Sequence, residues 1–299
     1  MEIGFIGNSA FMDRIVSSLR KTEHSVCGAY HSRKTKLGRD VNEYGSAEAL
    51  IFDADLVYVA QDELPLFEIS QIAIKETKHL FFENPFLLDY EAFRHLFHLA
   101  RESKSVIRFS QKLRTHPVYT PVRDQLNPLF VSFRLDAYQE LKAFDDRKRV
   151  LFDIASVIWD TLHRDLRKMH YFPLEYHTRY PGSFFFDMDF DNGTHVNLLF
   201  NHLAGLPAFY VEFIQASKRF LLDFIGPGLS VYDEIRGSYN PRIGKLGSEA
   251  EWIAKDFKNF VLNLKDARLP LTINEDNQSV LYLTHSLLNE VNYKTQLMA

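Results

Sequence analysis

The 299-residue sequence predicts two domains: an N-terminal α/β domain with a doubly wound parallel sheet and a C-terminal α+β domain with an open, mostly antiparallel sheet. Two observations predict this. Within residues 3–110, short apolar runs without alternation, typical of buried parallel strands, alternate with segments of helical spacing. After Pro117 the apolar runs alternate with polar residues and are joined by turn signals, as antiparallel strands are. We therefore expect domains at 1–116 and 117–299.

The first domain alternates five strands with four helices. Leu56–Ala60 is a continuous apolar run, which indicates a strand buried on both faces. Tyr90–Ser103 carries Phe93 and Phe97 one helical turn apart, which indicates a helix with one buried face. The same criteria predict further strands at 3–6, 25–30, 79–82 and 106–110, and further helices at 11–19, 46–50 and 66–76.

The second domain mixes alternating segments with helices. Ser183–Phe190 and Thr194–His202 alternate, and Asp191-Asn192-Gly193 between them is a hairpin turn signal. Val150–Leu166 has strong helical spacing. Further strands are expected at 130–138, 208–216 and 219–224, and further helices at 120–126, 248–265 and 275–293.

Composition excludes several classes of protein. The 35 basic and 39 acidic residues give a net charge of −4, which argues against a nucleic-acid partner. Cys27 is the only cysteine, so an intramolecular disulfide is impossible and we expect a reducing, cytoplasmic location. The N-terminus has no signal-peptide pattern, and no apolar run approaches the roughly 18 residues of a membrane span. No histidine pair has the spacing of a metal site, so we expect no metal.

The turn after the first strand is the candidate dinucleotide site. In the Rossmann form of the doubly wound sheet this turn reads G-x-G-x-x-G/A, because glycine permits the tight turn, the approach of the pyrophosphate and close helix packing. The chain has 13 glycines against roughly 21 at average composition, and this turn keeps only the first of its three. Free N–H groups at the start of the next helix still favour an anion. We assign cofactor binding to Gly7, Asn8, Ser9, Phe11 and Met12.

The end of the second strand bears on the choice of nucleotide. Enzymes that select NAD place an acid there for the ribose hydroxyls, whereas an arginine suits the 2′-phosphate of NADP. Here Ser32-Arg33-Lys34 follows, without an acid. These residues are either a clamp for the 2′-phosphate or a solvated basic loop, and the clamp favours NADP over NAD.

Several segments resemble the Gfo/Idh/MocA oxidoreductase family. They occur in the family's order and spacing over nearly the whole chain: Asp53–Ala60, Thr77–Pro85, Arg114–Pro117 and Asp153–Asp160. The resemblance implies a nicotinamide dinucleotide, contacted also by Ala60, Gln61, Glu83 and Asn84, and a small-molecule substrate. It also implies a homo-oligomer that forms through the C-terminal sheet.

The sequence departs from the family at the residues that move protons. The family's Glu-Lys-Pro reads Glu83-Asn84-Pro85 here, and the histidine of its second-domain helix is replaced by Val157. Asn84 can hydrogen-bond a ligand oxygen but cannot take a proton, and Val157 can do neither. The catalytic candidates that remain are Asn84, Asp153 and Asp160.

Two interpretations of the aspartates are open. Asp153, Val157 and Asp160 share one helical face, so either carboxylate could supply acid–base chemistry. Alternatively, Asp160 pairs with Arg164 on the helix and Asp153 supports local structure. Two functions follow: an NAD(P)-dependent oxidoreductase with replaced proton-transfer groups, or a non-catalytic dinucleotide- or ligand-binding scaffold that kept the fold.

Overall fold

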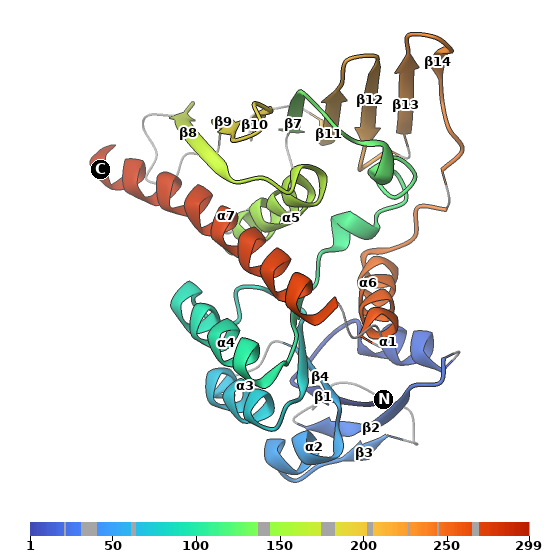
Figure 1. The fold of residues 1–299 in the computed structure, drawn as a ribbon, viewed down its shortest axis with the longest axis vertical. Helices are drawn as coiled ribbons and strands as arrows, with labels where there is room; N and C mark the ends of the chain where they lie inside the picture. Colours follow the sequence, from blue (N-terminus) through green and yellow to red (C-terminus); the bar gives the residue numbers. More distant parts are fainter. Residues whose placement is uncertain are drawn as a thin grey trace. The chain divides into compact units, whose positions relative to one another are not determined.

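The computed structural model describes residues 1–20, 22–30, 41–60, 64–136, 144–174, 183–201, 206–226, 228–243, 245–264 and 269–298. The chain forms two compact units (Figure 1). One comprises Met1–Thr115 and Gly247–Tyr282, and the other comprises His116–Leu246 and Leu283–Ala299. The expected boundary, after residue 116, lies one residue from the point at which the chain first passes from one unit to the other, between Thr115 and His116. The expected second domain, 117–299, differs from the structure because Gly247–Tyr282 returns to the first unit.

The first unit contains the expected doubly wound sheet. Six parallel strands lie in the order β3-β2-β1-β4-β5-β6. Their bounds are Glu2–Ile6 (β1), Ser25–Tyr30 (β2), Asn42–Glu43 (β3), Leu56–Val59 (β4), His79–Phe82 (β5) and Ile107–Phe109 (β6). Strand β3 was not expected, because two exposed residues carry no periodic signal.

Four helices connect these strands. They are α1 (Met12–Leu19), α2 (Ala47–Asp53), α3 (Leu66–Lys75) and α4 (Tyr90–Ser103). Side-chain caps fix two of the starts: Ser46 Oγ accepts from Ala49 N–H at 3.2 Å, and Asp89 Oδ1 accepts from Ala92 N–H at 2.7 Å. Phe93 of α4 packs edge-on against Phe82 of β5, with ring centroids 5.0 Å apart. The face of α4 that its apolar spacing predicts to be buried is thus the face that packs against the sheet.

A later helix, α6 (Glu249–Asn263), covers the other face of the sheet together with α1. Phe257 of α6 stands edge-on to Tyr58 of β4 at 5.2 Å and to Phe81 of β5 at 4.9 Å. These contacts explain why α6 joins the first unit: without it, an aromatic sheet face would lie in water.

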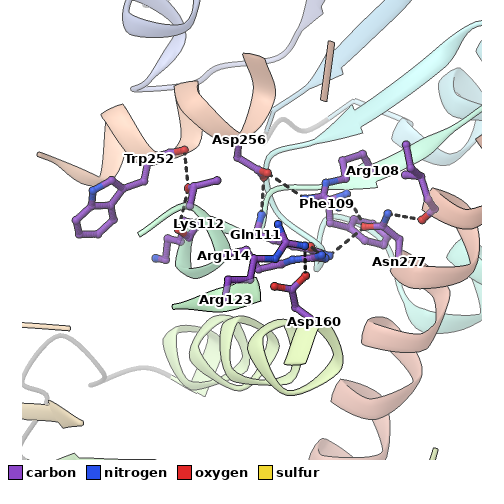
Figure 2. Close-up of polar contacts among 12 residues, drawn as sticks. Arg108, Phe109, Gln111, Lys112, Arg114, Arg123, Asp160, Trp252, Asp256 and Asn277 are labelled. Carbon is purple, nitrogen blue, oxygen red and sulfur yellow. Dashed lines mark hydrogen bonds and ion pairs between the residues drawn. The ribbon is translucent and has the colours of Figure 1, made fainter. Parts of the chain in front are cut away.

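The free edge of β6 is covered by side chains of α7 (Leu269–Met298). Asn274 accepts from Ile107 N–H at 2.8 Å and donates to the Ser105 carbonyl at 2.8 Å. Asn277 accepts from Phe109 N–H at 3.3 Å (Figure 2). The two side-chain amides pair with the strand as a further strand would, and so satisfy backbone hydrogen-bonding groups at its edge.

The second unit contains a mostly antiparallel sheet of eight strands, as expected. The order is β14-β13-β12-β11-β7-β10-β9-β8; β7 pairs with β10 in parallel, and the other described pairings are antiparallel. The bounds are Phe130–Asp136 (β7), Leu166–Pro173 (β8), Phe184–Phe190 (β9), His195–Asn201 (β10), Ala208–Ile214 (β11), Lys218–Asp223 (β12), Gly228–Asp233 (β13) and Gly237–Tyr239 (β14). Gly193, at φ +81°, makes the expected hairpin turn between β9 and β10.

One expectation for this unit is wrong, and a second has different bounds in the structure. The expected helix 120–126 is a series of turns that ends in a short 3-10 helix, Arg123–Gln125, in which the Gln125 N–H donates to the Val122 carbonyl at 2.8 Å. The expected helix 150–166 is α5, Phe144–Leu162, and it ends earlier because His163 turns to φ +48°. Strands β8, β13 and β14 were not expected.

Candidate functional site

The carboxyl ends of three neighbouring parallel strands form one edge. Ala60 N–H donates to the Ile6 carbonyl at 2.8 Å, and Glu83 N–H donates to the Val59 carbonyl at 2.9 Å. The strand order reverses between β1 and β4, so the connections leave the sheet in opposite directions there. In open α/β sheets, ligands bind outside the carboxyl ends of the strands at this point.

The turn between β1 and α1 retains the backbone shape that its first glycine allows. Gly7 has φ +87°, where a side chain would be strained, and its N–H donates to the Tyr30 carbonyl at 3.1 Å. Ser9 is 4% exposed, and its Oγ accepts from Phe11 N–H at 3.0 Å. The serine therefore folds into the turn and does not project from it.

This turn fits a pyrophosphate through its backbone. Ala10 is exposed, and the N–H groups of Met12 and Asp13 lie in the first turn of α1, which has no intrahelical acceptors for them. Met12 is fully buried among α1, α6 and the sheet, so it fills the core where the third glycine would allow closer packing. The Asp13 carboxylate repels an anion, and Ser9 Oγ occupies the N–H of Phe11. We therefore expect this turn to bind an anion more weakly than a turn with all three glycines would.

The end of β5 carries two of the expected site residues. The Tyr58 hydroxyl donates to Glu83 Oε2 at 2.7 Å. Asn84 Oδ1 accepts from Phe86 N–H at 3.0 Å, so the amide shapes the local turn. Ala60, at the end of β4, is fully buried. Ser32, Arg33, Lys34 and Gln61 lie outside the described residues, and their roles stay predictions.

On α5, the position of the expected histidine lies in the core. Val157 is fully buried. Asp153 is 6% exposed, and its backbone carbonyl accepts from Ser156 Oγ at 2.6 Å. The residue at position 157 is thus part of the packing of this unit, which agrees with a valine there.

Asp160 has partners that sequence reasoning missed. Its side chain is fully buried and accepts from Arg123 Nη2 at 2.5 Å (Figure 2). It also accepts from the Tyr119 hydroxyl at 2.8 Å. The expected pairing with Arg164 is wrong, because α5 ends at Leu162 and Arg164 lies beyond it. No local spacing connects residues 119 and 123 to 160, so only the fold brings them together.

His116 is a further buried titratable group of the second unit. Its ring lies 4.8 Å from that of Phe224, and burial lowers its pKa to about 4. It is therefore neutral near pH 7. Among the described residues, no group of three or more His, Cys, Asp or Glu side chains could hold a metal ion, and no helix is long and apolar enough to cross a membrane.

Comparisons with known proteins give structural matches. No family model matches the chain, and no curated protein matches its sequence. Among solved structures, UDP-N-acetylglucosamine 3-dehydrogenase GnnA from Acidithiobacillus ferrooxidans aligns with TM-score 0.83 and 18% identity over 99% of both chains. Biliverdin reductase from Synechocystis sp. PCC 6803, in complex with biliverdin and NADP+, aligns with TM-score 0.71 and 13% identity over 98% of both.

A third match is an oxidoreductase from Agrobacterium radiobacter in complex with NAD+, L-tartaric acid and magnesium. It aligns with TM-score 0.78 and 12% identity over 100% of this chain and 99% of the other. At these identities the likeness shows a shared fold that covers both units. The resemblance read from the sequence is confirmed at that level.

Proposed function

We propose that this chain, which has the fold of the Gfo/Idh/MocA oxidoreductases, binds a nicotinamide dinucleotide at the carboxyl edge of its parallel sheet and acts on a small-molecule substrate. The observation that carries the proposal is the turn between β1 and α1. Gly7 keeps φ +87°, Ser9 folds inward, and the turn leads into α1 beside the reversal of strand order. A cytoplasmic location remains part of the proposal.

In this proposal, different segments of the chain contact different parts of the cofactor. The backbone from Gly7 to Met12 holds the pyrophosphate, and the end of β2 with Ser32, Arg33 and Lys34 holds the adenosine half. The two basic residues Arg33 and Lys34 support a preference for NADP. The bound nicotinamide supplies hydride transfer. Ala60, Gln61, Glu83 and Asn84 then flank the nicotinamide half.

A non-catalytic binding or scaffold protein is the second candidate, and buried Val157 favours it. A valine in the core cannot take a proton, and Asn84 Oδ1 is already bonded to Phe86 N–H. Asp160 is engaged by Arg123 and Tyr119, which supports a structural role. In the oxidoreductase, proton transfer falls to Asp153 or to the substrate itself.

Calorimetric titration with NADPH and NADH tests the binding proposal. Ala10→Glu adds a negative charge on the exposed part of the turn and should weaken dinucleotide binding about tenfold or more. Gln71→Glu, in the middle of α3, adds the same charge elsewhere and should leave the affinity unchanged. No binding of either nucleotide by the wild type at millimolar concentration would overturn the proposal. An Arg33→Ala variant that binds NADPH as tightly as the wild type would refute the clamp.

Turnover separates the two candidates. UDP-N-acetylglucosamine, biliverdin and L-tartrate, the molecules named with the structural neighbours, are suitable first substrates with both nucleotides. Reduction or oxidation of the nicotinamide by one of them, lost in Asp153→Asn, supports the oxidoreductase and a role for that carboxylate. Tight nucleotide binding without turnover across a broad set of sugars and keto acids supports the scaffold.

Self-association through the eight-stranded sheet is the proposed quaternary contact. Along each strand of this sheet, every second side chain points to the same exposed face. That face carries five exposed large apolar side chains: Phe172, Tyr210, Ile214, Leu221 and Tyr232. Apolar patches of this kind mark interaction surfaces. A second copy of the chain is the proposed partner.

A further inference from the structure

Tyr58 and Glu83 form a polar pair at the carboxyl edge of the parallel sheet. Tyr58 is fully buried in β4, and its hydroxyl donates to Glu83 Oε2 at 2.7 Å. Glu83 follows β5 directly and is half-buried. The two strands are neighbours, with Tyr58 opposite Phe81, so the bond joins adjacent strand ends.

The tyrosine ring has a fixed orientation. It stacks on Phe81 at 5.4 Å, meets Phe257 edge-on at 5.2 Å and lies 5.4 Å from Phe5. Three aromatic neighbours leave the ring little freedom, so the hydroxyl points to one place. The bond from this oriented hydroxyl also restricts the movement of the Glu83 carboxylate.

The strand order locates this carboxylate relative to a bound dinucleotide. In a doubly wound sheet the pyrophosphate lies at the turn after β1, and the adenosine ribose lies at the end of β2. Here the neighbours continue as β2-β1-β4-β5. The nicotinamide half therefore extends toward β4 and β5, where Glu83 lies.

The residue types at the end of β5 indicate which groups of the dinucleotide Glu83 would contact. The family resemblance places a lysine after this glutamate, but here Asn84 is uncharged and its Oδ1 accepts from Phe86 N–H. Glu83 is thus the ionisable residue of the Glu83-Asn84-Pro85 segment. An ionised carboxylate only accepts hydrogen bonds, and ribose hydroxyls donate them.

We propose that Tyr58 is a positioning residue that holds Glu83 to accept hydrogen bonds from the ribose hydroxyls of the nicotinamide half. This inference rests on the proposed dinucleotide binding. Tyr58 acts only through Glu83 and does not touch the ligand. A positioned carboxylate binds without the entropy cost of ordering a mobile side chain.

The test compares a whole dinucleotide with its adenosine fragment. Calorimetry measures the dissociation constants of NADPH and 2′,5′-ADP, or of NADH and ADP if NADH binds more tightly. Tyr58→Phe removes one oxygen and keeps the ring packing. It should weaken the dinucleotide about tenfold and leave the fragment unchanged. Glu83→Ala should weaken the dinucleotide at least as much.

A double variant and a matched control complete the design. In the Glu83→Ala background, Tyr58→Phe should have no further effect, because a positioning residue loses its role with the residue it positions. Tyr44→Phe removes the comparable bond from Tyr44 to Asp53 Oδ2 (2.7 Å) and should leave the ratio of the two affinities unchanged.

Three results would overturn the inference. They are unchanged dinucleotide affinity in Tyr58→Phe, an equal loss for dinucleotide and fragment, and an undiminished loss in the Glu83→Ala background. Absence of dinucleotide binding by the wild type would instead refute the proposed function, and the inference with it. Circular dichroism of Tyr58→Phe should match that of the wild type.

Discussion

The Arg123 guanidinium lies 2.5 Å from the carboxylate of Asp160, whose side chain is fully buried while that of Arg123 is 41% exposed. The pair joins the short 3-10 helix to α5. We expect Arg123→Ala to lower the free energy of unfolding by about 1–2 kcal/mol, because it removes a charge-assisted hydrogen bond from a buried carboxylate. Arg164→Ala, beyond the end of α5, should change it by less than about 0.5 kcal/mol. Urea denaturation checks both.

The same pair decides how Asp160 is interpreted. If Asp160 is structural, Asp160→Asn should lower stability and leave nucleotide affinity unchanged. A variant that keeps wild-type stability but loses turnover would instead assign the carboxylate to the chemistry.

Val157 gives a second prediction. Restoring the histidine that the family resemblance implies at this position should destabilise the protein, because the site is fully buried. We expect Val157→His to cost about 2–4 kcal/mol through overpacking and an added polar ring. Arg149→His, at a half-buried position of the same helix, is the control and should cost far less. Wild-type stability of Val157→His would show that the position is open to a ligand.

Asn274 gives a third prediction, about the covered edge of β6. Asn274→Ala removes the partners of Ile107 N–H and the Ser105 carbonyl, and should cost about 2–3 kcal/mol. Hydrogen exchange of the Ile107 amide should accelerate strongly. Asn263→Ala, exposed at the end of α6, should change neither quantity. Unchanged exchange at Ile107 would contradict the strand-like role of the amide.

His116 predicts a dependence of stability on pH. Burial lowers its pKa to about 4 in the folded state, against roughly 6.5 when unfolded, so below pH 6.5 the unfolded chain binds the proton first. Its contribution is therefore fully present above pH 6.5 and is lost as the pH falls toward 4, by on the order of 3 kcal/mol.

His116→Gln removes this titration. Burial also lowers the pKa of His79, so the quantity to measure is the difference between wild type and variant at each pH. That difference should shift in favour of His116→Gln between pH 6.5 and 4. Parallel stability curves over this range would rule the contribution out.

Leu221 tests the proposed contact between two copies of the chain. Light scattering with gel filtration should find the wild type as an oligomer and Leu221→Glu as a monomer, because the charge lies on the apolar face. Leu262→Glu, on an exposed position of α6, makes the same substitution elsewhere and should leave the mass unchanged. An oligomer that survives Leu221→Glu would place the contact elsewhere.

Much of the fold was predictable because burial leaves a local signature. Leu56–Val59 is apolar throughout because it is covered on both faces, and the Phe93–Phe97 spacing follows one face of α4. Short or exposed elements lack this signature, so β3 and β8 were missed. The expected helix 120–126 is wrong because the spacing of so short a segment does not distinguish an α-helix from tighter turns.

The candidate site also combines features that the sequence predicts with features that only the structure shows. The sequence by itself determined the turn at Gly7, the replacement of the expected lysine by Asn84, and the presence of Val157 where the resemblance implies histidine. Only the tertiary structure decided that Ser9 folds inward, that Tyr58 holds Glu83, and that Asp160 pairs with Arg123 and not with Arg164. Periodicity records whether a residue is buried, whereas the choice of partner depends on which distant segments pack together, and no local pattern encodes that choice.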